Sequence, residues 1–219
     1  MSGAAVDAAA EKFSHCPIDQ DFVTILRNPA DTEQYVVMAI ARKEREMVES
    51  GRIIVHTGNG KGKTTAALGT AFRALGHGQK VCVIQFLKGQ GKYGERLMAG
   101  KFENLDWFIC GKGFVFNKEN LEEDRKVARE GFALAKEKIG SDLYDLVILD
   151  EITYLPHYDF LEVESIVELL RTKPQRLSVI LTGRDADPEL IKIADTVSSI
   201  DSIKHGYQSG MKAKKGIEF

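Results

Sequence analysis

The segment TGNGKGKTT at residues 57–65 constrains the fold of this chain more than any other feature. An apolar, β-branched run at 52–56 precedes it and predicts a strand, and a helical pattern follows it to about Leu75. Glycines let the backbone turn tightly enough for successive N–H groups to point into one concavity. The N-terminus of the following helix adds about half a positive charge there. The segment therefore predicts a phosphate-binding P-loop between a strand and a helix.

The second half of this loop matches the P-loop pattern, and its first half departs from it. The Gly-Lys-Thr run that ends at Thr64 places a lysine for the phosphates and a hydroxyl for Mg²⁺ at the expected positions. Thr57 stands where the pattern has glycine, and two further glycines and a second lysine follow it. The candidate phosphate-binding residues are Gly58, Gly60, Lys61, Gly62, Lys63, Thr64 and Thr65.

Two carboxylates follow the apolar run at 146–149. Asp150 and Glu151 stand where this predicted strand ends. Ligands bind at the carboxyl ends of the strands in open α/β sheets, so we expect both side chains to face the loop. Asp150 is expected to hold Mg²⁺ directly or through water, while Glu151 either joins the ligand shell or acts as a general base. The metal-binding candidates are thus Thr64, Asp150 and Glu151.

Apolar runs alternate with amphipathic segments throughout residues 52–204. Near-continuous apolar strands separated by helices imply a mostly parallel sheet with helices on both faces. We therefore predict an α/β domain at 51–219 with the RecA-like architecture of P-loop proteins, and expect Trp107, the only tryptophan, in its core. The predicted strands are 52–56, 80–86, 105–110, 145–149, 177–182 and 196–200, and the helices after the loop helix are 119–139, 160–171 and 188–194.

Residues 1–50 lack this alternation and form an N-terminal extension. A polar break at 28–31 precedes a predicted helix at about 32–50, which has an apolar stripe and a charged face. This helix either packs on its own domain or covers a site or a neighbouring subunit.

The composition limits the classes of partner. The formal net charge is −2, which argues against a dedicated nucleic-acid binder and against attraction to an anionic membrane. No apolar run approaches the length that spans a bilayer, and the first ten residues do not resemble a secretory signal. We therefore expect a cytoplasmic protein.

These residues indicate a site for Mg²⁺ and a nucleoside triphosphate, but not the bond that breaks. A phosphotransferase or ATPase of RecA-like type would use the same lysine, hydroxyl and carboxylates, with Glu151 orienting water. A nucleotide-dependent switch without catalytic activity is a second alternative.

Motifs spread over residues 51–219 distinguish these alternatives. Taken together, they resemble the CobA-type ATP:corrinoid adenosyltransferases. The motifs are the loop at 57–65, RALGHG at 73–78, VIQFLKG at 83–89, GER at 94–96, GF at 113–114, LDEITY at 149–154, LTGR at 181–184 and the segment 204–217.

The resemblance implies a reaction. The family transfers the 5′-deoxyadenosyl group of ATP to Co(I) of a reduced corrinoid, cobalamin or a cobyrinic acid derivative, and releases triphosphate. It also implies Mg²⁺, an electron-donor protein such as a reductase or flavodoxin, and a homodimer. Because Co(I) is the nucleophile, the protein needs no Ser, Cys or His nucleophile. Lys63, Thr64 and Glu151 are then the candidate catalytic residues.

Further site residues follow from the resemblance alone. Asn59 and Arg73 match family positions that contact the nucleotide. The family has a Phe-x-Trp pair where this chain has Phe114 and Phe116, which are our candidates for an apolar shelf under the corrinoid. The family's N-terminal helix can close over the partner subunit's corrinoid site, and residues 32–50 are expected to do so here.

Overall fold

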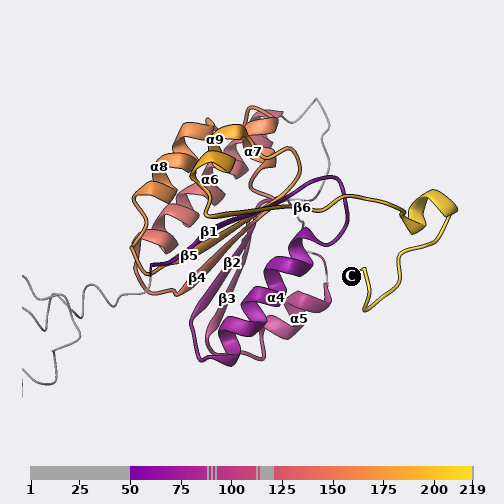
Figure 1. Cartoon of the computed structure of the whole chain (residues 1–219), viewed down its shortest axis with the longest axis horizontal. Helices are drawn as coiled ribbons and strands as arrows, with labels where there is room; N and C mark the ends of the chain where they lie inside the picture. Colours follow the sequence, from indigo (N-terminus) through magenta and orange to yellow (C-terminus); the bar gives the residue numbers. More distant parts are fainter. Residues whose placement is uncertain are drawn as a thin grey trace, which may run out of the picture. The chain divides into compact units, whose positions relative to one another are not determined.

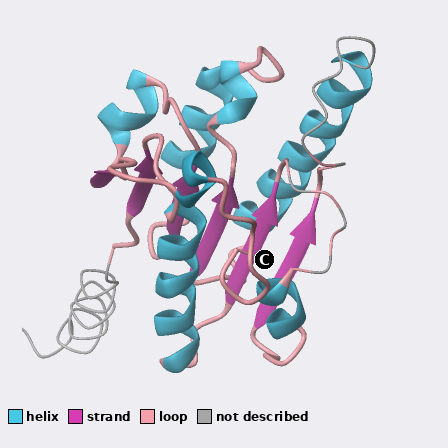
Figure 2. Ribbon diagram, turned by 90° about the vertical axis from the view of Figure 1, so that its right-hand side faces the viewer, coloured by secondary structure: helices cyan, strands magenta, loops and turns pink. Residues whose placement is uncertain are grey.

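The six strands make one parallel sheet in the order β3-β2-β4-β5-β1-β6. The computed structural model describes residues 50–87, 89, 91, 93–111, 113 and 121–218. All arrows in Figure 2 point the same way, and the predicted α/β class is confirmed. The strands are β1 (Ile53–Thr57), β2 (Val81–Gln85), β3 (Leu105–Ile109), β4 (Leu146–Asp150), β5 (Ser178–Thr182) and β6 (Thr196–Ser199).

Helices cover both faces of the sheet (Figure 1). On one face lie α4 (Lys63–Gly76) and α5 (Gly94–Ala99); on the other lie α6 (Leu121–Gly140), α7 (Tyr154–His157), α8 (Val163–Arg171) and α9 (Pro188–Ile193). A 3-10 turn, η2 (Gly206–Ser209), follows the last strand. The sequence analysis did not predict α5 and α7, because six and four residues are too few to show a helical period.

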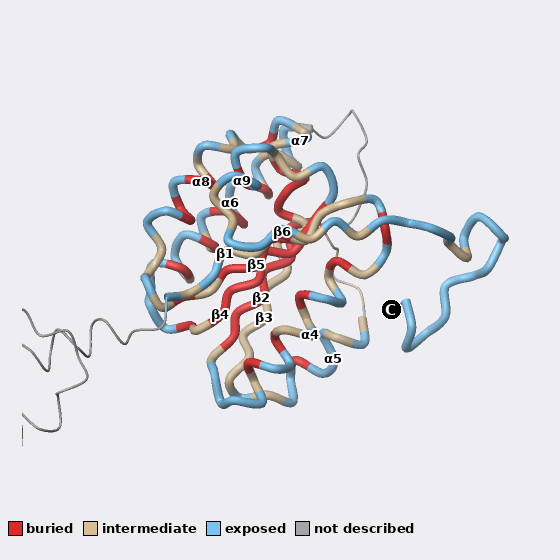
Figure 3. Tube along the Cα trace, in the orientation of Figure 1, coloured by how far each residue is buried: buried red, intermediate tan, exposed pale blue. Residues whose placement is uncertain are grey.

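Each face of the sheet buries an apolar layer, and Figure 3 shows the buried positions along the central strands. β2 and β4 are buried along their whole length, including the polar residues Gln85 and Asp150 that end them, and their apolar runs predict this burial. In the layer under α4 the buried residues of the helix are alanines, Ala67 and Ala71 among them, which pack on strand residues such as Ile148. The opposite layer contains large side chains from α6 and α8, including Phe132 and Ile166.

The strand order determines which residues meet at the carboxyl edge of the sheet. β5 lies between β1, which leads into the P-loop, and β4, which ends in the acidic pair. His56 of β1 is in register with Thr182 of β5, and Leu149 of β4 with Leu181. The end of β5 is therefore flanked by the P-loop on one side and by Asp150 on the other.

Some predictions fall outside the residues described above. They concern the helix at 32–50, Phe114 and Phe116. Within the described part of the chain, no helix is long and apolar enough to cross a membrane.

Candidate functional site

The P-loop wraps around the ammonium group of Lys63. Its Nζ donates to the carbonyl oxygens of Gly58 at 2.7 Å and Gly60 at 2.9 Å, and the residue is 8 % exposed. Gly62 has φ of 120°, which only glycine adopts readily, and Gly60 N–H donates to the carbonyl of Ile200 at 2.6 Å. Desolvation lowers the pKa of Lys63, which the negative charge of Glu151 partly offsets. The loop thus holds a buried cation against two of its own carbonyl oxygens.

Asp150 is the centre of a buried hydrogen-bond network. The side chain is fully buried at the end of β4. Its Oδ1 accepts from the hydroxyls of Thr64 at 2.8 Å and Thr182 at 2.7 Å, and its Oδ2 accepts from the amide of Gln85 at 2.8 Å. A buried carboxylate needs such donors, since its desolvation is costly. The network connects the first turn of α4 to the ends of β2, β4 and β5.

Glu151 differs from Asp150 in backbone conformation and in exposure to the pocket. This difference bears on which of the two carboxylates would hold the metal. Its φ of 67° turns the chain sharply after β4, and its N–H donates to Thr182 Oγ1 at 3.0 Å. Left-handed backbone at a residue with a long side chain is uncommon and is often found at functional sites. Glu151 lines the pocket, whereas Asp150 is buried beneath it.

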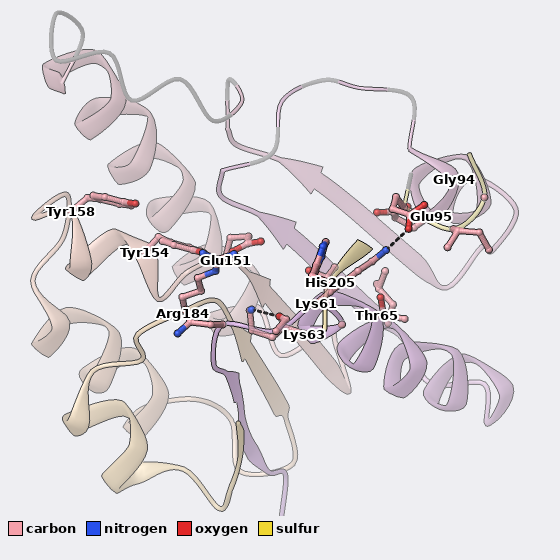
Figure 4. A pocket seen from close by; sticks show the side chains of 18 residues that line it. Lys61, Lys63, Thr65, Gly94, Glu95, Glu151, Tyr154, Tyr158, Arg184 and His205 are labelled. Atoms are coloured by element: carbon pink, nitrogen blue, oxygen red, sulfur yellow. Dashed lines mark hydrogen bonds and ion pairs between the residues drawn. The ribbon is translucent and has the colours of Figure 1, made fainter. Parts of the chain in front are cut away.

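A pocket of ≈ 890 Å³ opens above this network. In Figure 4, Arg184, Glu151 and Tyr154 line one side and Lys61, Thr65 and Glu95 line the other, with Lys63 between them. Its volume is near the upper end of the usual range for small-molecule sites. Three cations thus converge on one cavity: Lys61 and Lys63 from the P-loop, and Arg184 from the loop after β5.

The loop after β5 brings Arg184 into the pocket. Its carbonyl oxygen accepts from Thr153 Oγ1 at 2.7 Å, and the N–H of Ala186 donates to Thr57 Oγ1 at 3.2 Å. Thr57, which stands where the P-loop pattern has glycine, therefore connects the start of the loop to the segment that carries the arginine. We did not assign Arg184 a role from the sequence, although the motif at 181–184 contains it.

The C-terminal segment forms another wall of the pocket. Gly216, Ile217 and Glu218 line it, together with His205. Glu218 Oε1 accepts from Lys61 Nζ at 2.9 Å and its Oε2 accepts from the N–H of Lys214 at 2.7 Å. Lys61 and this N–H lower the pKa of the Glu218 carboxyl. A carboxylate therefore lies beside the lysine that we expect to contact phosphate.

The residues at the base of the pocket fit a magnesium ion. Mg²⁺ prefers oxygen ligands and is often held by one or two protein groups plus substrate phosphates. The Thr64 hydroxyl and the Asp150 carboxylate are two such oxygens, 2.8 Å apart, at the N-terminus of α4. In a P-loop site this hydroxyl and this carboxylate hold the ion.

Comparison with known proteins identifies the family. The model of the ATP:corrinoid adenosyltransferase family BtuR/CobO/CobP matches residues 49–219. The chain belongs to this family. It is 42 % identical over 179 residues to the corrinoid adenosyltransferase of Escherichia coli strain K12, an alignment that covers 82 % of this chain and 91 % of that protein.

Further relatives have the same description. The corrinoid adenosyltransferase CobA of Salmonella typhimurium is 40 % identical (82 % of this chain, 91 % of the relative), and that of Pseudomonas aeruginosa is 37 % identical (83 % and 88 %). Among solved structures, the flagellar accessory protein FlaH from Methanocaldococcus jannaschii has a TM-score of 0.48 at 13 % identity, covering 72 % of this chain and 76 % of that one. The chain is thus an enzyme of the corrinoid adenosyltransferase kind, and the predicted family is confirmed.

In this corrinoid adenosyltransferase, most of the predicted site residues lie around one pocket. Arg73 does not line it: the residue is exposed in the last turn of α4, about 13 Å along the helix axis from Thr64. Gly58 supports the loop through its carbonyl oxygen. The pocket-lining residues that the sequence predicted are Asn59, Gly60, Lys61, Gly62, Lys63, Thr64, Thr65 and Glu151.

Proposed function

We propose that this enzyme transfers the 5′-deoxyadenosyl group of ATP to Co(I) of a reduced corrinoid and releases inorganic triphosphate. The observation that carries the proposal is the convergence of Lys61, Lys63 and Arg184 on the P-loop pocket. In this reaction the whole triphosphate leaves, so its negative charge must be neutralised as the bond breaks. Three cations and a helix N-terminus suit that task.

The bond changes are simple and balance without a proton. The cobalt lone pair attacks C5′ of the ribose, the C5′–O bond breaks, and its electron pair leaves with the triphosphate. Cobalt is formally oxidised from Co(I) to Co(III) as the cobalt–carbon bond forms.

The residues of the chain bind and orient the leaving group. The loop N–H groups, Lys61 and Lys63 bind the phosphates, and Arg184 approaches them from the opposite side. Mg²⁺, when bound, neutralises part of the triphosphate charge. Thr64 would hold the ion from the loop and Asp150 from below, while Glu151, at the pocket surface, would bind a water in its outer shell. Asn59 and Arg73 are proposed to contact the nucleotide.

The corrinoid and the protein partners extend the proposal beyond the pocket. Phe114 and Phe116 are proposed to form the apolar shelf that excludes a lower axial ligand, and the helix at 32–50 to cover the site in a homodimer. An electron-donor protein in the cytoplasm would reduce the cobalt of the corrinoid to Co(I). If the extension covers the site, deletion of residues 1–50 should raise the KM for the corrinoid, and an unchanged KM would refute this part.

The deciding experiment identifies the products of one anaerobic reaction. The protein is incubated with Mg²⁺, ATP and chemically reduced cobalamin. We expect a light-sensitive cobalt–carbon adduct and one intact triphosphate per adduct, and Lys63→Met should lower the rate. ADP and phosphate as the only products would instead establish a phosphotransferase or ATPase.

A further inference from the structure

A chain of hydrogen bonds extends from the base of the pocket across two more strands. Trp107 Nε1 on β3 donates to Gln85 Oε1 on β2 at 3.1 Å, and Gln85 Nε2 donates to Asp150 Oδ2 on β4 at 2.8 Å. Gln85 and Asp150 are in direct register across β2 and β4. The hydroxyl of Thr64 contacts the other oxygen of the same carboxylate.

The chemistry of the groups fixes the direction of this chain. An indole N–H is only a donor, so the face of the Gln85 amide that meets Trp107 must be its oxygen. The amide NH₂ then faces Asp150, which accepts. A flipped amide would place its oxygen against the carboxylate and its NH₂ against the indole N–H, and neither contact is a hydrogen bond. Trp107 thus selects one of two orientations of Gln85.

The position of Gln85 is costly unless it has a role. It is 1 % exposed at the end of a strand that is otherwise apolar. A buried amide costs free energy unless its groups are hydrogen-bonded, and an aliphatic side chain would fill the same place without this demand. The amide gives Asp150 a hydrogen-bond donor in a fixed position. Asp150 is not exposed to solvent, so water does not supply this donor.

We propose that Gln85 and Trp107 are positioning residues that orient the Asp150 carboxylate toward Thr64 for binding the metal of the nucleotide complex. The inference rests on the proposed function only in taking Mg²⁺ and ATP as ligands of this pocket. Partners in the outer shell of a metal site typically change metal affinity about 10–100-fold when removed. Mg²⁺ is held partly by phosphate, so we expect the lower end of this range for Gln85 and less for Trp107.

The test compares ATP affinity with and without Mg²⁺, measured by isothermal titration calorimetry. The ratio of the two affinities should fall about tenfold in Gln85→Met and about threefold in Trp107→Phe. The double variant should match Gln85→Met, because the two residues act in series. An unchanged ratio in both single variants would overturn the proposal.

Tyr144→Phe provides the matched control. Tyr144 is 3 % exposed, and its hydroxyl donates at 2.7 Å to Asp106, the neighbour of Trp107 on β3. This variant removes one buried donor to β3 without touching Gln85 or Asp150. It should lower stability while leaving the Mg²⁺ ratio unchanged. A ratio that falls equally in Tyr144→Phe would show that general destabilisation is responsible.

The intact protein offers a readout that needs no Trp107 variant. Trp107 is the only tryptophan of the chain, so tryptophan emission reports on the surroundings of this one indole, including its hydrogen bond to Gln85. Addition of Mg²⁺ to the ATP complex should shift its emission, and Gln85→Met should abolish the shift; emission insensitive to Mg²⁺ overturns the proposal. The measurements involve no corrinoid, so a protein that binds Mg²⁺ and ATP but transfers no adenosyl group leaves the inference standing while the proposed reaction fails.

Discussion

The hydroxyl of Thr182 is expected to contribute strongly to the stability of the domain. It donates to the buried carboxylate of Asp150 and accepts from the N–H of Glu151, and the residue itself is 0 % exposed. Thr182→Val keeps the volume and removes both contacts. A hydrogen bond to a charged group contributes about 1.5–3 kcal/mol and an unsatisfied N–H costs about 1 kcal/mol or more, so we expect a loss of about 3 kcal/mol.

Urea-induced unfolding of the nucleotide-free protein, followed by circular dichroism, measures this loss. In thermal unfolding the same change corresponds to a Tm lower by about 6–12 °C for a domain of this size. Thr182→Ser is the control, because it keeps the hydroxyl and loses only a buried methyl, which costs about 1 kcal/mol. If the valine variant is as stable as the serine variant or more so, the network is not what stabilises the carboxyl ends of these strands.

Three further predictions concern other parts of the domain. Glu218→Gln removes the exposed ion pair between Glu218 and Lys61, which competes with phosphate for the lysine. The variant should therefore bind inorganic triphosphate more tightly, by up to about fivefold in calorimetry, whereas equal affinities of variant and native protein would exclude this competition. Gly183→Ala should lower the free energy of unfolding by at least about 2 kcal/mol, because φ is 140° and the new Cβ would lie 2.0 Å from Thr153 Oγ1. Gly78→Ala, with φ of 73° and open space around it, should cost less, and the reverse order would contradict this reasoning. Burial raises the pKa of the Cys82 thiol to about 12, so its contribution to stability is complete below pH 9 and is lost as pH rises toward 12. Unfolding measured from pH 8 to pH 11 should therefore show a steeper loss for the native protein than for Cys82→Ala, whereas parallel curves would refute the shift.

The strands and the P-loop were predictable because their signals are local. Each predicted strand lies within one or two residues of the observed one, since a run of apolar residues marks burial directly. The cap of α9 was predictable for the same reason: Asp187 precedes Pro188, and its side chain accepts from Glu189 N–H at 2.8 Å.

The site residues and contacts that the sequence did not predict depend on which strands are neighbours in the sheet. Thr182 and Arg184 belong to the site because β5 lies between β1 and β4, an order that hydrophobic periodicity does not encode. Trp107 was expected in the core and is partly buried against the layer under α4, but its bond to Gln85 depends on β3 pairing with β2. Such contacts join residues far apart in the sequence, so only the folded sheet reveals them.

The contact between Gly60 and Ile200 has a consequence for the order of assembly. The P-loop N–H at residue 60 binds a carbonyl that the chain reaches only after β6, near the end of the domain. Contacts of such large sequence separation form late, because a long loop must close before they are made. The phosphate site, although encoded in the first strand–helix unit, is therefore expected to be among the last regions to mature during synthesis. Nucleotide would then stabilise the fully folded domain and not its folding intermediates. ATP binding would therefore indicate that folding is complete.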